Sequence, residues 1–301
     1  MNPPALAPSD RQPLLLALAI VATTVSGCAS GTAPAPELAD GLAPEVAGQY
    51  RVLLPPGYPD AGPYPVVYFL HDYFGGSAVL WRKGVAAELE RGMAAGELPP
   101  FVLVAPAGDR GWWSDSYDGR RRYESWLHDR LLPEIERRYR VIPGREGRAV
   151  TGISMGGFGA LKSALRRPDL WSHASSLSGA LIPLDLESVL GFPWLQRRIL
   201  RRVFGPIESA DAVYFRDDLR TLALRTAPPD APPLLLRCGR EDEYRLAPAA
   251  EKLAARLERS GWRVTLHLEP GTHDWAYWRT SAVETLAWHA HQFLRQHPDS
   301  D

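Results

Sequence analysis

From residue 50 onward, short apolar runs alternate with longer stretches in which apolar residues recur every three or four positions. Several of the short runs are apolar throughout, which is typical of strands buried on both faces of a parallel sheet. The longer stretches have the spacing of amphipathic helices. This alternation predicts an α/β fold in which helices flank a mostly parallel central sheet. The predicted strands are 50–54, 66–70, 101–105, 149–153, 234–237 and 264–268, and the predicted helices are 79–95, 123–139, 157–166, 246–259 and 276–296.

Residues 183–225 interrupt this rhythm and predict a helical insertion. We expect it beside the carboxyl edge of the sheet, where ligands bind in open α/β folds. Within it, residues 194–204 read as an amphipathic cationic helix. Three interpretations of this helix stay open, namely a surface for anionic lipid, a lid over a site, and a solvated face. Its basic residues are Arg197, Arg198, Arg201 and Arg202.

The amino terminus has the layout of a secretory signal. No charged residue occurs between Arg11 and Glu37, and the twelve residues 14–25 are apolar or small. A helix needs about 20 such residues to cross a bilayer. The ending Val-Ser-Gly-Cys28 resembles a bacterial lipobox, and an ordinary signal peptide is the alternative. We expect residues 1–27 to be removed, Cys28 to carry lipid, and residues 28–48 to form a tether, which predicts an exported protein anchored in the bacterial envelope.

Composition narrows the classes of function. The chain has 301 residues, 45% of them hydrophobic, so residues 49–297 suffice for one catalytic domain. The formal net charge of -1 argues against nucleic acid as a partner, because such a binder needs a positive field. The two cysteines, Cys28 and Cys238, are too few for a disulfide scaffold or an all-cysteine zinc site.

The segment Gly152-Ile-Ser154-Met155-Gly156 lies between a predicted strand and a predicted helix. A Gly-x-Ser-x-Gly sequence in this context is typical of a nucleophile, because a sharp turn exposes the hydroxyl and the glycines avoid a clash at Cβ. The helix that follows would place its dipole and the backbone N–H of Met155 where an oxyanion develops. Ser154 is therefore the candidate nucleophile.

A serine nucleophile needs a base, and the base needs an acid that orients it. The usual order with this motif is serine, acid, histidine, with the base in a loop after the last strand. Of the eight histidines, His273 stands in such a loop, in Pro-Gly-Thr-His273-Asp-Trp. The acid should follow the preceding strand, where Glu241, Asp242 and Glu243 stand together. These residues alone leave three carboxylates as alternatives.

A second oxyanion donor is expected from the loop after the second predicted strand, which reads His71-Asp72-Tyr73-Phe-Gly-Gly. We predict the backbone N–H of Tyr73 for this role. His71 precedes the serine, so we expect it to shape the loop. The chemistry requires no metal, and His289 and His291 would point to different faces of a helix, which is a poor arrangement for zinc.

With these motifs, residues 48–297 resemble the esterase D or "putative esterase" branch of the α/β-hydrolases. This branch includes tributyrin and feruloyl esterases, S-formylglutathione hydrolases and the antigen 85 mycolyltransferases. The matching segments are 152–160 (GISMGGFGA), 177–179 (LSG), 238–242 (CGRED) and 271–278 (GTHDWAYW).

The resemblance implies an α/β-hydrolase fold, Ser154, Asp242 and His273 as a catalytic triad, and no cofactor. The family's spacing is what selects Asp242 from the three carboxylates. Residues 108–117 resemble the aromatic loop beside the family's substrate pocket. Many members carry glycine directly after the histidine of the oxyanion loop, where this chain has Asp72. A carboxylate that pointed inward there would disfavour a developing oxyanion.

Trp112, Trp113 and Tyr117 are candidates for an acyl or aromatic pocket, and packing of their loop against the core is the alternative. The combined prediction is a serine carboxylesterase that hydrolyses a small-molecule, lipid or saccharide ester through an acyl-enzyme on Ser154. One alternative is an acyltransferase that passes the acyl group to a sugar or lipid alcohol. The other is an inactive envelope lipoprotein that uses the fold for binding.

Overall fold

The computed structural model describes residues 50–181, 200–206 and 216–296. The predicted insertion is therefore described only at its parts 200–206 and 216–225. Several predictions lie outside the described residues, namely the signal at 1–27, the lipid-bearing Cys28, the tether at 28–48, Arg197 and Arg198.

Among the described residues, seven strands form one sheet in the order β1-β3-β2-β4-β5-β6-β7. β1 pairs antiparallel with β3, and the other pairs are parallel. The chain leaves β2 for β3 on one side and returns to β4 on the other, so the ends of β2 and β4 flank a switch point where ligands bind. The bounds are Tyr50–Leu53 (β1), Val66–Leu70 (β2), Val102–Pro106 (β3), Arg148–Gly152 (β4), His173–Leu177 (β5), Leu234–Gly239 (β6) and Val264–Glu269 (β7).

The six strands predicted from apolar runs are confirmed to within two residues at either end. The seventh strand, β5, was not predicted, because its sequence His-Ala-Ser-Ser-Leu is mostly polar although all five residues are buried. Ser175 Oγ donates to Thr151 Oγ1 at 2.6 Å and lies 2.7 Å from His289 Nε2. Polar groups that satisfy one another in this way can fill a core position, and an apolar pattern does not detect them.

The helices agree with the predictions apart from two details. The predicted helix at 79–95 is divided into two, because Gly84 between them adopts a left-handed φ of 78°. The predicted helix at 123–139 contains one wider turn, Leu127–Leu131, between two α-helical parts. The bounds are Val79–Arg82 (α1), Val85–Ala94 (α2), Tyr123–Trp126 (α3), Leu132–Arg138 (α4), Met155–Arg166 (α5), Leu219–Leu222 (α8), Leu246–Arg259 (α9) and Trp275–Gln296 (α10).

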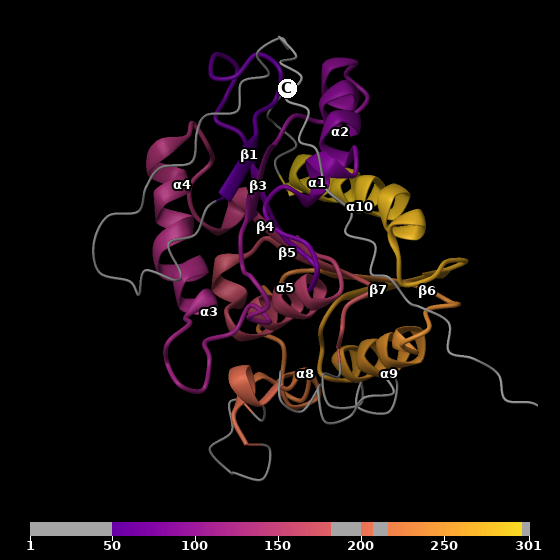
Figure 1. Cartoon of the computed structure of the whole chain (residues 1–301). Helices are drawn as coiled ribbons and strands as arrows, with labels where there is room; N and C mark the ends of the chain where they lie inside the picture. Colours follow the sequence, from indigo (N-terminus) through magenta and orange to yellow (C-terminus); the bar gives the residue numbers. More distant parts are fainter. Residues whose placement is uncertain (1–49, 182–199, 207–215, 297–301) are drawn as a thin grey trace, which may run out of the picture. The chain divides into compact units, whose positions relative to one another are not determined.

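Two hydrophobic cores lie on opposite faces of the sheet, and β2 contributes to both. Val66, Tyr68 and Leu70 belong to one core, and Val67 and Phe69 belong to the other. Residues of α3, α4, α5, α8 and α9 complete the first core, and residues of α1, α2 and α10 complete the second (Figure 1). Burial on both faces is why the central strands are apolar throughout.

The polar core between β5 and α10 contains two fully buried histidines. The rings of His173 and His289 stack with their centroids 4.8 Å apart. Burial lowers the pKa of His173 to about 3 and holds the pKa of His289 well below its usual value. Both rings are therefore neutral in the folded protein at neutral pH.

We expect the free energy of unfolding to fall as the pH decreases from about 6.5 towards 4. In this window the unfolded histidines bind protons and the folded ones do not, so each contributes a loss of up to about 1.4 kcal/mol per pH unit. Urea unfolding at several pH values measures this slope. His289→Gln should reduce the slope, and the exposed His267 serves as the control through His267→Gln. Equal slopes in all three proteins would contradict the prediction.

Candidate active site

Ser154 stands on a strained turn between β4 and α5. Its backbone has φ 54° and ψ -113°, and it directly precedes the first helical residue, Met155. Its N–H donates to the carbonyl of Leu177 at 2.9 Å, which ties the turn to β5. A Cβ on Gly156 would overlap the carbonyl oxygen of Leu70, so only glycine allows α5 to start this close to β2. The glycines of the motif are therefore required by packing.

Three residues from separate loops meet at this turn. Ser154 Oγ lies 2.9 Å from Nε2 of His273, and Nδ1 of His273 lies 2.7 Å from Oδ2 of Asp242. Ser154 and Asp242 are both buried, so the hydrogen bonds at the two ends of this chain are largely shielded from water. The structure thus brings together the three residues predicted as nucleophile, base and acid.

The three neighbouring carboxylates have different contacts. Asp242 alone touches the imidazole ring, and its Oδ1 also accepts the N–H of Tyr244 at 3.0 Å. Glu241 and Glu243 instead accept backbone N–H groups of the loop that carries His273. Asp242 is not the cap of α9, because that helix begins after Arg245.

Two aromatic side chains enclose the ring of His273. The rings of Tyr244 and Trp278 each lie edge-on to it, with centroids 4.7 Å away. Trp278 Nε1 donates to Ser178 Oγ at 3.1 Å, which fixes the indole. The contact with Tyr244 is absent from the sequence predictions, although Trp278 belongs to the segment 271–278 on which the resemblance rests.

Cys238 lies behind the acid at the end of β6. Its Sγ is 3.8 Å from Oδ2 of Asp242, and the residue is buried. Burial, assisted by the negative charge of Asp242, raises the pKa of this thiol far above its usual value. Cys238 is therefore an uncharged, unreactive core group beside the acid.

The loop after β2 is fixed by His71. The N–H of Gly108 donates to His71 Nε2 at 2.9 Å, so Nδ1 carries the proton and donates to the carbonyl of Asp72 at 2.7 Å. Trp113 Nε1 donates to the carbonyl of His71 at 3.2 Å. Burial lowers the pKa of His71, which favours the neutral ring that these contacts need. Its role in the structure is to shape the loop.

The side chain of Asp72 turns along its own loop. Its Oδ1 accepts the N–H of Phe74 at 2.9 Å. Its Oδ2 is buried next to Gly75 and has no hydrogen-bond partner among the described residues. Tyr73 follows directly, and its ring packs against Trp112 at 6.5 Å. Among the described residues, neither carboxylate oxygen forms a hydrogen bond with Ser154 or His273.

The three aromatic pocket candidates lie in different surroundings. Trp113 is 2% exposed and packs edge-on to His71 and Tyr123, which is a core position. Trp112 packs with the rings of Phe158 and Phe204. Tyr117 is half exposed, and its N–H donates to the carbonyl of Val203 at 2.7 Å. Trp113 therefore packs its loop against the core, which was the alternative to a place in a substrate pocket.

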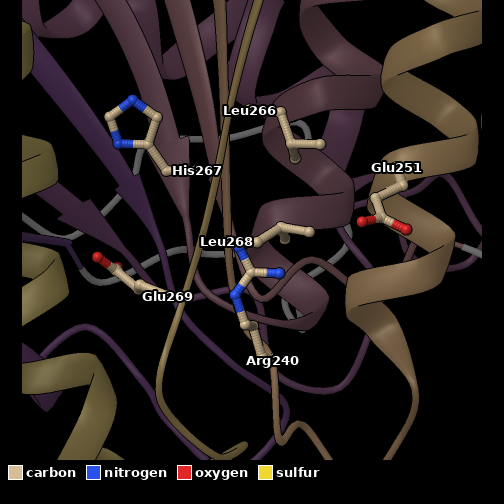
Figure 2. Close-up of a pocket in the computed structure, with 6 residues that line it drawn as sticks. All are labelled: Arg240, Glu251, Leu266, His267, Leu268 and Glu269. Carbon is tan, nitrogen blue, oxygen red and sulfur yellow. The ribbon is translucent and has the colours of Figure 1, made fainter.

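Two hollows differ in their relation to this site. One of about 410 Å³ follows β7, with Leu266 and Glu251 on one side of the strand and His267 and Glu269 on the other (Figure 2). Its lining does not include the serine, the histidine or the aspartate described above. The other, about 330 Å³, adjoins the loop after β2, and its lining residues include Tyr73, Phe74, Arg110 and Arg121.

The described residues contain neither a metal-binding cluster nor a helix that could span a membrane. Among them, no group of three or more histidine, cysteine or acidic side chains is arranged to hold a metal ion. His289 is buried against His173, and His291 is exposed. No helix in the described ranges has the length and apolar character needed to cross a membrane.

The strand order and the serine turn define an α/β-hydrolase fold. The chain belongs to the family described as "Putative esterase", whose model matches residues 46–289, which confirms the resemblance read from the motifs. A solved ferulic acid esterase shares the fold, with a TM-score of 0.66, 22% identity, and coverage of 84% of this chain and 96% of that one.

Two curated relatives are similar in sequence. Esterase Rv1288 of Mycobacterium tuberculosis (strain H37Rv) is 35% identical over 206 residues, which cover 60% of this chain and 43% of the relative. An acetyl esterase of Caldicellulosiruptor saccharolyticus is 24% identical over 230 residues, which cover 74% of this chain and 82% of that protein. The chain therefore matches less than half the length of the mycobacterial relative.

Proposed function

We propose that this protein is a serine carboxylesterase that forms an acyl-enzyme on Ser154. The observation that carries the proposal is the unbroken chain of hydrogen bonds from Ser154 through His273 to Asp242, with distances of 2.9 and 2.7 Å. Membership of the esterase family supports it. The names of the relatives, an acetyl esterase and a ferulic acid esterase, support a carboxylic ester as the substrate.

In the first half of the reaction, His273 Nε2 takes the proton of Ser154 Oγ while the oxygen attacks the carbonyl carbon. Asp242 holds the Nδ1–H of the ring and stabilises the imidazolium that forms. The C–O bond to the alcohol then breaks, and His273 returns the proton to the leaving oxygen. Water attacks the acyl-enzyme with His273 again as the base, which releases the acid and restores the serine.

The negative charge of the tetrahedral intermediate needs hydrogen-bond donors that are already in place. Met155 is the first residue of α5, so its N–H is not used by the helix and the helix dipole adds to its effect. Tyr73 lies in the loop after β2, which neighbours β4 in the sheet. Its backbone N–H is the second donor in this proposal. Trp112, whose ring lies 6.5 Å from that of Tyr73, and Tyr117 are the pocket candidates in this proposal.

We further propose that the protein is exported and anchored to the cell envelope through a lipid on Cys28. The support is the uncharged stretch at 14–25 followed by the lipobox-like Val-Ser-Gly-Cys28. One acyl chain holds a protein only marginally at a membrane, so stable anchoring requires more than one chain on this cysteine.

Labelling with a fluorophosphonate probe tests the proposed activity. The folded protein should react at Ser154, as identified by peptide mapping, and should hydrolyse p-nitrophenyl butyrate. His273→Ala should lose both, since the serine then lacks its base. His267→Ala, at an exposed histidine of β7, should retain both. A folded protein that neither reacts at Ser154 nor hydrolyses short esters would support the inactive binding protein instead.

A further inference from the structure

The loop that carries His273 forms hydrogen bonds with the acidic run, which is the segment Glu241-Asp242-Glu243. The N–H of Gly271 donates to Glu241 Oε2 at 2.6 Å, and the N–H of His273 donates to Glu243 Oε2 at 3.0 Å. In the backbone, the N–H of Glu241 donates to the carbonyl of Gly271 at 3.0 Å. Glu241 and Glu243 thus accept backbone N–H groups from the two residues that flank Thr272.

Both glutamates are exposed, which makes their arrangement unusual. A glutamate side chain that is fixed at a surface loses conformational entropy, and surface contacts offset little of that loss. Within the described residues, neither side chain forms an ion pair within 4.0 Å. Their partners are the two backbone N–H groups, and a carboxylate forms stronger hydrogen bonds to such donors than a neutral acceptor does.

The loop contains a glycine whose backbone conformation suits no other residue. Gly271 has a φ of 155°, in a region that other residues rarely adopt, and a Cβ there would overlap the ring of Tyr277. Glycine is the residue with the widest backbone freedom, so it leaves the loop free to move unless other groups hold it. The imidazole two residues later must nevertheless keep a distance of 2.9 Å to Ser154 Oγ.

We propose that Glu243, with Glu241, is a positioning residue for His273, an inference that rests on the proposed esterase function. The acidic run holds the base at three points: Glu241 at the N–H of Gly271, Glu243 at the N–H of His273, and Asp242 at the ring. Asp242 orients the imidazole, and the flanking glutamates fix the backbone from which it projects. A small displacement of the base lengthens the proton transfer and slows the reaction.

Kinetics of variants in the full chain test this role. Glu243→Ala should lower kcat for p-nitrophenyl butyrate by about 10-fold or more, with KM changed by less than about 2-fold, since the ester's own contacts remain. Glu243→Gln should stay within about 3-fold of the original protein, because its amide oxygen still accepts the N–H. Glu251→Ala removes the same exposed side chain from α9 and should leave kcat unchanged.

Glu241→Ala should also lower kcat, and the double alanine variant should be slower than either single one. The midpoint of urea unfolding establishes that each variant is folded. If Glu243→Ala does not fold, Glu243→Met gives the same test, because it keeps the length of the side chain and has no acceptor oxygen.

Two results would overturn the inference alone: a kcat of Glu243→Ala equal to that of Glu251→Ala, or a Glu243→Gln variant as slow as Glu243→Ala. In both cases the original protein still hydrolyses the ester through Ser154, so the proposed function stands. If the original protein shows no ester hydrolysis that depends on Ser154, both the inference and the proposed function are wrong. A fall in kcat that glutamine reverses is the result expected of a positioning residue.

Discussion

Ser154→Ala should lower kcat/KM for p-nitrophenyl butyrate by roughly 10⁴-fold or more. The alanine has no oxygen to attack the carbonyl, and His273 and the oxyanion donors alone retain only a small part of the rate enhancement. Because the methyl side chain fits where the hydroxymethyl group was, KM should change by less than about 3-fold. Initial rates over a range of ester concentrations measure both quantities.

Ser260→Ala is the matched control, because this serine ends α9 and lies outside the candidate site. It should retain the original rate, and urea unfolding should give similar midpoints for the two variants. Hydrolysis by Ser154→Ala above about one tenth of the original rate would mean that another group attacks the ester, and the assignment of the nucleophile would be abandoned.

The fold was predictable because burial on both faces of a sheet leaves a strong pattern in the sequence. β2 is apolar at every position, since Val66, Tyr68 and Leu70 enter one core while Val67 and Phe69 enter the other. The apolar pattern fails for β5, whose buried residues are mostly polar. Ser175 can be buried there because Thr151 on β4 and His289 on α10 form hydrogen bonds with its hydroxyl, and both partners are distant in sequence.

The candidate site was predictable in its serine and histidine, because each has a local context that constrains it. Ser154 needs a strand, a turn and a helix, and His273 needs a loop after the last strand, so the chain itself identifies them. The acid had no such context among three adjacent carboxylates. The family's spacing selected Asp242, and the folded loop shows the physical difference: Asp242 contacts the ring, whereas Glu241 and Glu243 contact the backbone.

Helix α5 carries a fully buried lysine that the proposed reaction does not use. Lys162 Nζ donates to the carbonyl of Trp113 at 2.9 Å and to Ser114 Oγ at 2.6 Å, and it lies 3.2 Å from Asp217 Oδ2 and 3.1 Å from Glu124 Oε2. Burial by itself would raise the pKa of Asp217, but the adjacent positive charges, that of Lys162 first among them, outweigh it and hold this pKa below its usual value. The ammonium group of Lys162 thus links two segments to α5, namely the loop of Trp113 and Ser114 and the segment that contains Asp217.

Lys162→Met should therefore lower the free energy of unfolding by about 3 to 5 kcal/mol. The apolar replacement fills a similar volume, but it leaves the buried carboxylate of Asp217 short of a partner and removes the donor to Trp113, whose backbone is held at a left-handed φ of 52°. Urea unfolding measures the loss. Lys252→Met, at an exposed lysine of α9, should change it by less than about 0.5 kcal/mol. Similar values for the two variants would show that the cluster contributes specificity of packing and little stability.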